Sequence, residues 1–160
     1  MTTLRVRVAD FAVGRDGDTV IATVGLGSCV AIALYDPATQ IGALAHVLLP
    51  SENMARDRTN RAKFPAAAVP MLLAEMKGLG SNGSIRARLV GGASMFASLL
   101  PTGGVNIGER NVVAARSALA AAGVPLIAED VGGDYGRSVY FHLTDGRIEV
   151  HSIKAGRRVI

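Results

Sequence analysis

Short apolar runs alternate with turn-forming residues through the first third of the chain, and this spacing restricts the fold more than any other feature. The runs cover residues 19–24, 30–35 and 41–49, and the breaks between them are a glycine-rich turn and an Asp-Pro turn. The first run predicts a strand that ends in the glycine-rich turn. The second run is apolar without interruption, which is typical of either a buried strand or the first turns of a buried helix.

Strand patterns also occur elsewhere in the chain. Alternating apolar and polar residues predict a half-buried strand over 4–8, which residues 11–13 continue. The Asp145-Gly146 step lies between two alternating segments, a strong hairpin signal. The remaining expected strands cover residues 85–90, 126–131, 137–143 and 147–154.

Two helices are expected. The first covers 64–77, where Pro70 near the first turns should end the initial turn or kink the helix. The second covers 111–122 and is closed by a glycine and a proline, as a helix stop should be. The polar residues 51–61 lack periodicity and predict a loop before the first helix.

The overall composition indicates one folded domain over residues 1–160. The sequence is 49% hydrophobic and 19% charged. A domain of this size buries roughly 70% of its unfolded surface, so a core can form without metals or crosslinks. No internal repeat and no long linker divides the sequence. With the expected elements this predicts an α+β class, with two helices against mostly antiparallel strands.

Charge, cysteine count and the N-terminal residues exclude several classes of protein. The formal net charge is +4, but no aromatic stacking platform or binding module joins the basic clusters, so we expect no nucleic-acid partner. The sequence shows no secretory signal and no apolar run long enough to cross a bilayer, which predicts a cytoplasmic protein. The single cysteine excludes an internal disulfide framework and suits a reducing compartment.

The one cysteine, Cys29, follows the glycine-rich turn, and His46 lies on the next apolar segment. A cysteine attacks as the thiolate, which an imidazole generates by accepting the thiol proton. Backbone N–H groups in a glycine-rich turn can hold an oxyanion, and Gly25 and Gly27 leave room for a substrate carbonyl. A hairpin-like return at residues 36–40 would bring Cys29 and His46 together as nucleophile and base.

Structural roles compete with this interpretation. A single cysteine is commonly a packed core thiol, and His46 could be a core histidine with satisfied hydrogen bonds. Zinc takes three or four ligands, whereas His142 and His151 lie in separate predicted strands, so we expect no metal site. The paired glycines at 91–92 and 132–133 lack the strand–turn–helix context of a phosphate-binding loop, and turns explain them better.

The segment 23–31, Thr-Val-Gly-Leu-Gly-Ser-Cys-Val-Ala, together with 46–50, resembles the signature of the CheD family, the chemoreceptor glutamine deamidases of bacterial and archaeal chemotaxis. Val47-Leu48-Leu49-Pro50 departs modestly, since methionine often precedes the Leu-Pro. The resemblance extends from about residue 19 to residue 154. Its other blocks, in the family's order, are 91–96 (Gly-Gly-Ala-Ser-Met-Phe), 106–111 (Asn-Ile-Gly-Glu-Arg-Asn) and 130–133 with Gly136-Arg137.

The resemblance implies a cysteine-hydrolase fold like that of the cytotoxic necrotizing factor catalytic domain, with packed, mostly antiparallel β-sheets and flanking helices. It also implies a catalytic triad of the nucleophile Cys29, the base His46 and the orienting hydroxyl of Thr23. Gly27 and Ser28 would hold the oxyanion and position the substrate. No metal ion or organic cofactor is expected.

The implied reaction is hydrolytic deamidation of glutamine side chains to glutamate on methyl-accepting chemotaxis receptors, through a thioester, in chemotactic adaptation. Glutamate methyl esters would react similarly, because methanol leaves more readily than ammonia. The implied partners are the receptors' cytoplasmic helices and a CheC-type phosphatase. The alternative is a binding regulator of such a phosphatase with catalysis secondary, although docking needs none of the three triad residues.

Overall fold

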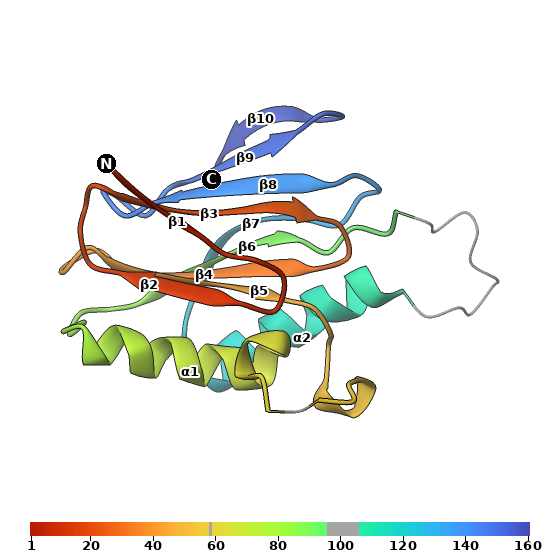
Figure 1. The fold of residues 1–160 in the computed structure, drawn as a ribbon, viewed down its shortest axis with the longest axis horizontal. Coiled ribbons are helices and arrows are strands. Elements are labelled where there is room, and N and C mark those ends of the chain that lie inside the picture. Colours follow the sequence, from red (N-terminus) through yellow and green to blue (C-terminus); the bar gives the residue numbers. More distant parts are fainter. Residues whose placement is uncertain (58, 96–105) are drawn as a thin grey trace.

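In residues 1–57, 59–95 and 106–160, which this computed structural model describes, two five-stranded sheets face each other (Figure 1). Two α-helices cover the outer face of the second sheet. Six of the eight strand pairings are antiparallel. The expected α+β class with packed, mostly antiparallel sheets is confirmed. Phe96, the last residue of one CheD-like block, lies outside the described residues.

The elements are distributed over the layers as follows. The first sheet contains, in spatial order, β1 (Thr2–Arg5), β3 (Thr19–Leu26), β8 (Arg137–His142), β9 (Ile148–Ser152) and β10 (Gly156–Val159). The second contains β2 (Phe11–Gly14), β5 (Ile41–Val47), β4 (Val30–Asp36), β6 (Arg86–Gly91) and β7 (Leu126–Val131). The helices are α1 (Pro65–Gly78) and α2 (Ile107–Ala121), and two short 3-10 helices are η1 (Glu52–Met54) and η2 (Arg61–Lys63).

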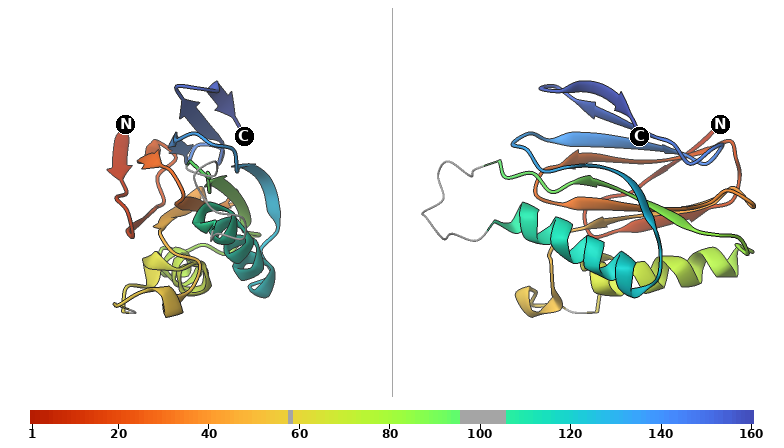
Figure 2. Two further views of the ribbon diagram at one scale, coloured as in Figure 1. Left: turned by 90° about the vertical axis from the view of Figure 1, so that its right-hand side faces the viewer. Right: turned by 180° about the vertical axis from the view of Figure 1, so that it is seen from behind.

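Two apolar cores hold the three layers together. One lies between the sheets and includes Ile21, Leu44 and Phe141, all fully buried. The other lies between the second sheet and the helices. The left view of Figure 2 shows this sheet and the helices from the end of the sandwich. Burial of each large apolar side chain stabilises the fold by about 1.5–3 kcal/mol. The helices present apolar stripes to this second core, formed by Ala68, Val69, Leu72 and Met76 on α1 and by Val112, Ala115 and Leu119 on α2.

The chain leaves the first sheet for the second between β3 and β4, at the right-hand end of the sandwich in Figure 1. The glycine-rich turn that contains Cys29 forms this corner. The ladder between β3 and β8 shifts register between Thr23 and Leu26, where the strand bends into the turn. The same end of the sandwich contains the C-terminal end of β5 and the N-terminal end of α2.

Several expectations needed correction at their boundaries. A single strand through 4–8 and 11–13 is wrong, because β1 pairs with β3 in the first sheet and β2 pairs with β5 in the second. Ala9, between them, has a left-handed φ of 61°, which ends the extended conformation. The continuously apolar residues 30–35 form strand β4 rather than a helix.

The second helix begins earlier than expected, at Ile107 rather than Asn111. Asn106 is its N-cap, and the Asn106 side chain accepts a hydrogen bond from the N–H of Glu109. The expected loop 51–61 contains η1 and the first residue of η2. The predicted hairpin at Asp145-Gly146 is confirmed, whereas β10 was not predicted. No helix in the described ranges is long and apolar enough to cross a membrane.

Candidate active site

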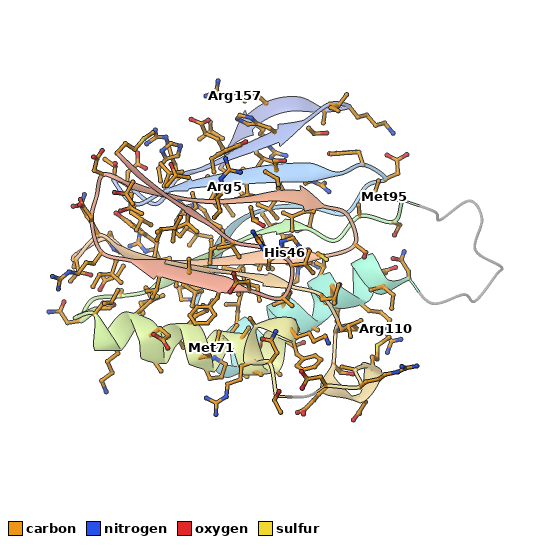
Figure 3. All side chains as sticks on the ribbon, viewed as in Figure 1. Arg5, His46, Met71, Met95, Arg110 and Arg157 are labelled. Carbon is orange, nitrogen blue, oxygen red and sulfur yellow. The ribbon has the colours of Figure 1, made fainter. Side chains whose placement is uncertain are left out.

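Thr23, Cys29 and His46 come from three neighbouring pieces of chain at one end of the sandwich. Thr23 lies on β3 in the first sheet, Cys29 directly precedes β4, and His46 lies on β5 in the second sheet. Figure 3 shows His46 between the two sheets. The imidazole is fully buried, and Thr23 is 1% exposed. The three residues whose roles the resemblance implies are therefore grouped in the fold, although they come from both sheets.

Thr23 joins the imidazole to the opposite sheet. Its Oγ1 lies 2.7 Å from Nδ1 of His46 and 2.8 Å from the carbonyl oxygen of Val6. The hydroxyl has one proton, which it donates to the Val6 carbonyl, because a carbonyl can only accept. Thr23 Oγ1 therefore accepts a hydrogen bond from His46. The proton in this hydrogen bond is on Nδ1 of the ring. Nε2 then has a free lone pair.

Nε2 of His46 is buried and has no hydrogen-bond partner among the described residues. A buried polar atom without a partner is uncommon and needs an explanation. Here the atom is a basic nitrogen whose tautomer is fixed from its other side. It is available to take a proton from a group that enters the space between the sheets.

Cys29 is placed to be that proton donor. Ala31 is the cross-strand partner of His46, and Cys29 lies two residues before Ala31, so the thiol shares a sheet face with the imidazole. Both side chains project into the space between the sheets, where Cys29 packs in the inner core. Diagonal neighbours of this kind are separated by about 7–8 Å between their Cα atoms. The imidazole and the thiol are not hydrogen-bonded in this structure.

Burial affects the two ionisable groups in opposite directions. It raises the pKa of the Cys29 thiol, which is 8% exposed, while the backbone N–H of Cys29 itself lowers that pKa in part. Burial lowers the pKa of His46 to about 4. Both effects disfavour the charged form of the group. The resting site is therefore a neutral thiol beside a neutral imidazole, rather than a thiolate–imidazolium pair.

Backbone contacts hold the turn before Cys29 against β6. The N–H of Gly92 donates to the Cys29 carbonyl over 2.8 Å, and the N–H of Ala93 donates to the Gly27 carbonyl over 2.9 Å. A side chain at Gly91 would collide with the Cys29 carbonyl, so this close approach requires glycine. Within the described ranges, no backbone carbonyl accepts from the N–H of Gly27 or Ser28. Among the described residues these two donors have no backbone acceptor that would compete with a substrate oxygen.

A groove with a volume of about 450 Å³ opens beside this turn. Gly25 and Met95 line one side, and Tyr135, His151 and Ile153 are among the residues that line the rest. Cys29 does not line the groove. The expected open space over both glycines is found only at Gly25, because the sulfur of Met95 lies against Gly27. Figure 3 shows Met95 at the end of the sandwich that contains the turn.

Sequence reasoning missed two residues of the site. Val6 lies in a segment that was expected to be a strand without a role in the site, but its carbonyl accepts a hydrogen bond from the Thr23 hydroxyl. Asn111 was expected as the first residue of the second helix and as part of a CheD-like block, but it is fully buried and donates hydrogen bonds to the carbonyls of Ser28 and Leu48. One signal was available, because Asn111 lies on the same helical stripe as Ala115 and Leu119. An amide on an apolar stripe indicates a specific hydrogen-bonding role.

The other two histidines lie on the outer face of the first sheet, where His151 also lines the groove. His142 and His151 lie on either side of Glu149, with nitrogen–oxygen distances of 3.4 Å and 3.3 Å. Among the residues that the structure describes, no group of three or more His, Cys, Asp or Glu side chains is arranged to hold a metal ion.

The family model and the curated relatives both identify one family. The model of the family described as CheD chemotactic sensory transduction matches residues 48–152. The probable chemoreceptor glutamine deamidase CheD of Caldanaerobacter subterraneus subsp. tengcongensis is 42% identical over 158 residues, which cover 98% of this chain and 97% of the relative. The probable chemoreceptor glutamine deamidase CheD 2 of Geobacter metallireducens is 45% identical over 155 residues, which cover 94% of each chain.

One solved structure has a similar fold. It is the crystal structure of a Neisseria meningitidis protein that matches the DUF152 family model. The TM-score is 0.54, and the match covers 84% of this chain and 65% of that chain at 14% sequence identity. At this identity the likeness concerns the fold alone.

Proposed function

The chain belongs to the CheD family, and from this premise we propose that it hydrolyses the side-chain amide of glutamine residues in methyl-accepting chemoreceptors to give glutamate. The observation that carries the proposed chemistry is the contact of Thr23 with Nδ1 of His46, which leaves a free, buried Nε2 on the same sheet face as the single cysteine. This is the arrangement of a nucleophile, a base and a group that orients the base.

The first half of the reaction forms a thioester and releases ammonia. Nε2 of His46 takes the thiol proton as the sulfur of Cys29 attacks the carboxamide carbon. The negative charge that develops on the amide oxygen is held by backbone N–H groups of the turn, at Gly27, Ser28 and Cys29. The imidazolium then gives its proton to the amide nitrogen, the carbon–nitrogen bond breaks, and ammonia leaves.

The second half regenerates the thiol. Nε2 of His46 takes a proton from water while the water oxygen attacks the thioester carbon. The carbon–sulfur bond breaks, the sulfur regains a proton from the imidazolium, and the product is a glutamate side chain. Throughout both halves the Thr23 hydroxyl oxygen accepts a hydrogen bond from Nδ1–H and keeps the ring in one orientation. We extend the proposal to glutamate methyl esters, which would release methanol by the same steps.

Exposed apolar side chains occur on the segments that carry the site. Val8, Val24 and Met95 are each about half exposed, and each lies within two residues of a residue that contacts the site. We call these three residues the apolar rim. Exposed apolar side chains on the segments that carry a reactive group suit a protein-binding surface. We propose that the rim meets the cytoplasmic helices of the receptor, which places the reaction in the cytoplasm.

Mass spectrometry of receptor cytoplasmic fragments tests this proposal directly. Wild-type protein should convert specific glutamines to glutamate, and Cys29→Ala should abolish the conversion. Conversion that persists in Cys29→Ala would overturn the assignment of the nucleophile. Tight binding to a CheC-type phosphatase without any conversion would instead favour the regulatory role, which stays a prediction.

A further inference from the structure

Asn111 on α2 contacts both catalytic segments at once. Its side-chain Nδ2 donates one hydrogen bond to the carbonyl of Ser28, at 2.9 Å, and another to the carbonyl of Leu48, at 3.1 Å. Ser28 directly precedes Cys29, and Leu48 lies two residues after His46. A single amide group therefore connects the segment of the proposed nucleophile to the segment of the proposed base.

This bridge lies where the backbone ladder ends. Val30 and Val47 form the last pair between β4 and β5 on this side, so no further ladder pair holds the chain at Cys29 to the chain at Leu48. The two carbonyls that Asn111 binds belong to the two strands as they separate. A primary amide has two N–H donors on one nitrogen and can satisfy both carbonyls, whereas an aspartate can satisfy neither.

The position of Asn111 is itself fixed by close packing. A Cβ at Gly108, one turn earlier on α2, would collide with the carbonyl of Ala93 and lie 2.7 Å from that of Gly92. Gly92 and Ala93 are the residues whose N–H groups bind the carbonyls of Cys29 and Gly27. The first turns of α2, this short segment and the catalytic turn thus pack as one unit.

The side-chain oxygen of Asn111 shows that packing is not the reason for an amide at this position. Oδ1 of Asn111 is buried and has no hydrogen-bond partner in the part of the chain that the structure describes. Burying an unpartnered oxygen destabilises a protein by about 1–3 kcal/mol. An apolar side chain would avoid this loss, so packing alone does not explain an asparagine. The two donors to Ser28 and Leu48 do explain it.

We propose that Asn111 is a positioning residue that sets the approach of the Cys29 thiol to His46, an inference that rests on the proposed function. Asn111 touches no reacting atom and acts through the backbone of both segments. A displacement of reacting groups by about 1 Å can lower a rate about 100-fold. Loss of this bridge should therefore lower kcat and leave the affinity for the receptor unchanged.

The test compares Asn111→Ser and Asn111→Asp with Leu119→Ala. Serine retains one donor, aspartate has nearly the same shape and no donor, and Leu119 is a buried core residue two turns further along the same helix. With a receptor fragment as substrate, Asn111→Ser should lower kcat by about 30- to 100-fold with KM within about twofold of wild type. Leu119→Ala should lower Tm at least as much but keep kcat within about twofold. Asn111→Asp should show the larger loss of kcat.

A second readout needs no receptor. The rate of Cys29 labelling by iodoacetamide is measured in wild type, His46→Ala, Asn111→Ser and the double variant. His46→Ala should slow labelling in the wild-type background and have little further effect in Asn111→Ser, because the bridge is then absent. If wild-type protein converts no glutamine, the proposed function fails and this cycle alone decides the role of Asn111.

Three outcomes would overturn the inference. These are a kcat for folded Asn111→Ser within about threefold of wild type, an equal loss of kcat in Leu119→Ala, and an effect of His46→Ala on labelling that is the same in both backgrounds. Failure of Asn111→Ser to fold would also overturn it, because the residue would then serve the fold and not the site.

Discussion

Thr23 and His46 are joined across the two sheets by a 2.7 Å contact between the threonine hydroxyl oxygen and Nδ1 of the imidazole. The hydroxyl proton is committed to the Val6 carbonyl, so the oxygen can only accept from the ring. The orientation of the base on the second sheet is thereby fixed by a residue of the first sheet. The packing of the two sheets determines the geometry of the site.

Replacing Thr23 by valine should lower kcat by about 100-fold or more, since a third group that orients a catalytic histidine contributes effects of this size. Valine has the shape of threonine but cannot accept a hydrogen bond from Nδ1–H of His46. The change also leaves the Val6 carbonyl buried without its donor, so unfolding should require about 1–3 kcal/mol less free energy. Deamidation of a receptor fragment and urea denaturation measure the two effects.

Thr23→Ser is the matched control for this change. Serine keeps the hydroxyl that both contacts use, so most of the activity should return. A Thr23→Val variant with wild-type kcat, or a Thr23→Ser variant as inactive as Thr23→Val, would contradict the orienting role.

The acid limb of kcat/KM should lie near pH 4 and not near 6.5. Burial lowers the pKa of His46 to about 4, and the base must be neutral to accept the thiol proton. Activity should stay level from pH 7 to about pH 5 and fall below that, because only then does His46 become protonated. A pH profile recorded with circular dichroism at each pH separates this limb from unfolding. A limb centred at 6.5 in folded protein would show that His46 is not the titrating base.

The same shift predicts how stability depends on pH. The pKa of His46 is lower in the folded protein than the ordinary 6.5, so the unfolded state binds the proton first. Stability should therefore be highest above pH 6.5 and fall by up to about 3 kcal/mol as the pH decreases toward 4. Urea denaturation across this range measures the change, and His46→Leu should lack it.

A separate window below pH 4 should come from Asp36. Burial raises the pKa of this carboxyl, but hydrogen bonds from Ser81 and from the N–H of Gly83 outweigh burial and lower the pKa to about 2. Its contribution to the free energy of unfolding is present above the ordinary pKa of 3.8 and is lost as the pH falls from there toward 2.

An unfolding free energy that does not change between pH 6.5 and 4 in wild type would contradict the assignment of the upper window to His46.

The elements that local patterns specify were predicted from the sequence, and the contacts between distant segments were not. The hairpin at Asp145-Gly146 and the strand 19–24 depend on residues that are neighbours in the sequence, so local patterns were enough to predict them. Segments 4–8 and 11–13 have similar strand patterns, but they belong to opposite sheets because their pairing partners lie far away in the sequence.

The candidate site shows the same division. Cys29 and His46 were expected as a pair from the residues and the turn between them, and Thr23 was expected from the resemblance alone. The bond from Thr23 to Val6 involves backbone geometry that no side-chain motif encodes. A role for Asn111 could have been predicted, because an amide on an apolar helical stripe is a local signal. Its two acceptors could not, because they come from segments distant in the sequence.

Arg137 should be among the most sensitive positions outside the site. Its side chain is 1% exposed, donates to Asp130 over 3.1 Å and to the Gly132 carbonyl over 2.8 Å, and stacks on Tyr135. Arg137→Met should destabilise the protein by about 3–5 kcal/mol, because it leaves the buried Asp130 carboxylate with the longer, 3.7 Å ion pair to the mostly exposed Arg158. Denaturant titration measures this loss.

The controls for Arg137 separate charge from geometry. Arg137→Lys should restore only part of the loss, since an ammonium lacks the planar fork that reaches two acceptors. Arg137→Met combined with Asp130→Asn should be more stable than Arg137→Met alone, because no buried charge is left unpaired. A loss below about 1 kcal/mol in Arg137→Met would show that this pair does not stabilise the fold.

A charge on the apolar rim should weaken receptor binding without changing the chemistry. Val24 follows Thr23 and is 55% exposed, and Val113 on α2 is equally exposed at 55% but lies on the helix layer. Val24→Lys should raise KM for a receptor fragment by about tenfold or more, because a lysine in the contact must be desolvated without a partner. Val113→Lys should leave KM unchanged, and labelling of Cys29 by iodoacetamide should be the same in both variants. Equal KM values for Val24→Lys and Val113→Lys would place receptor binding on another surface.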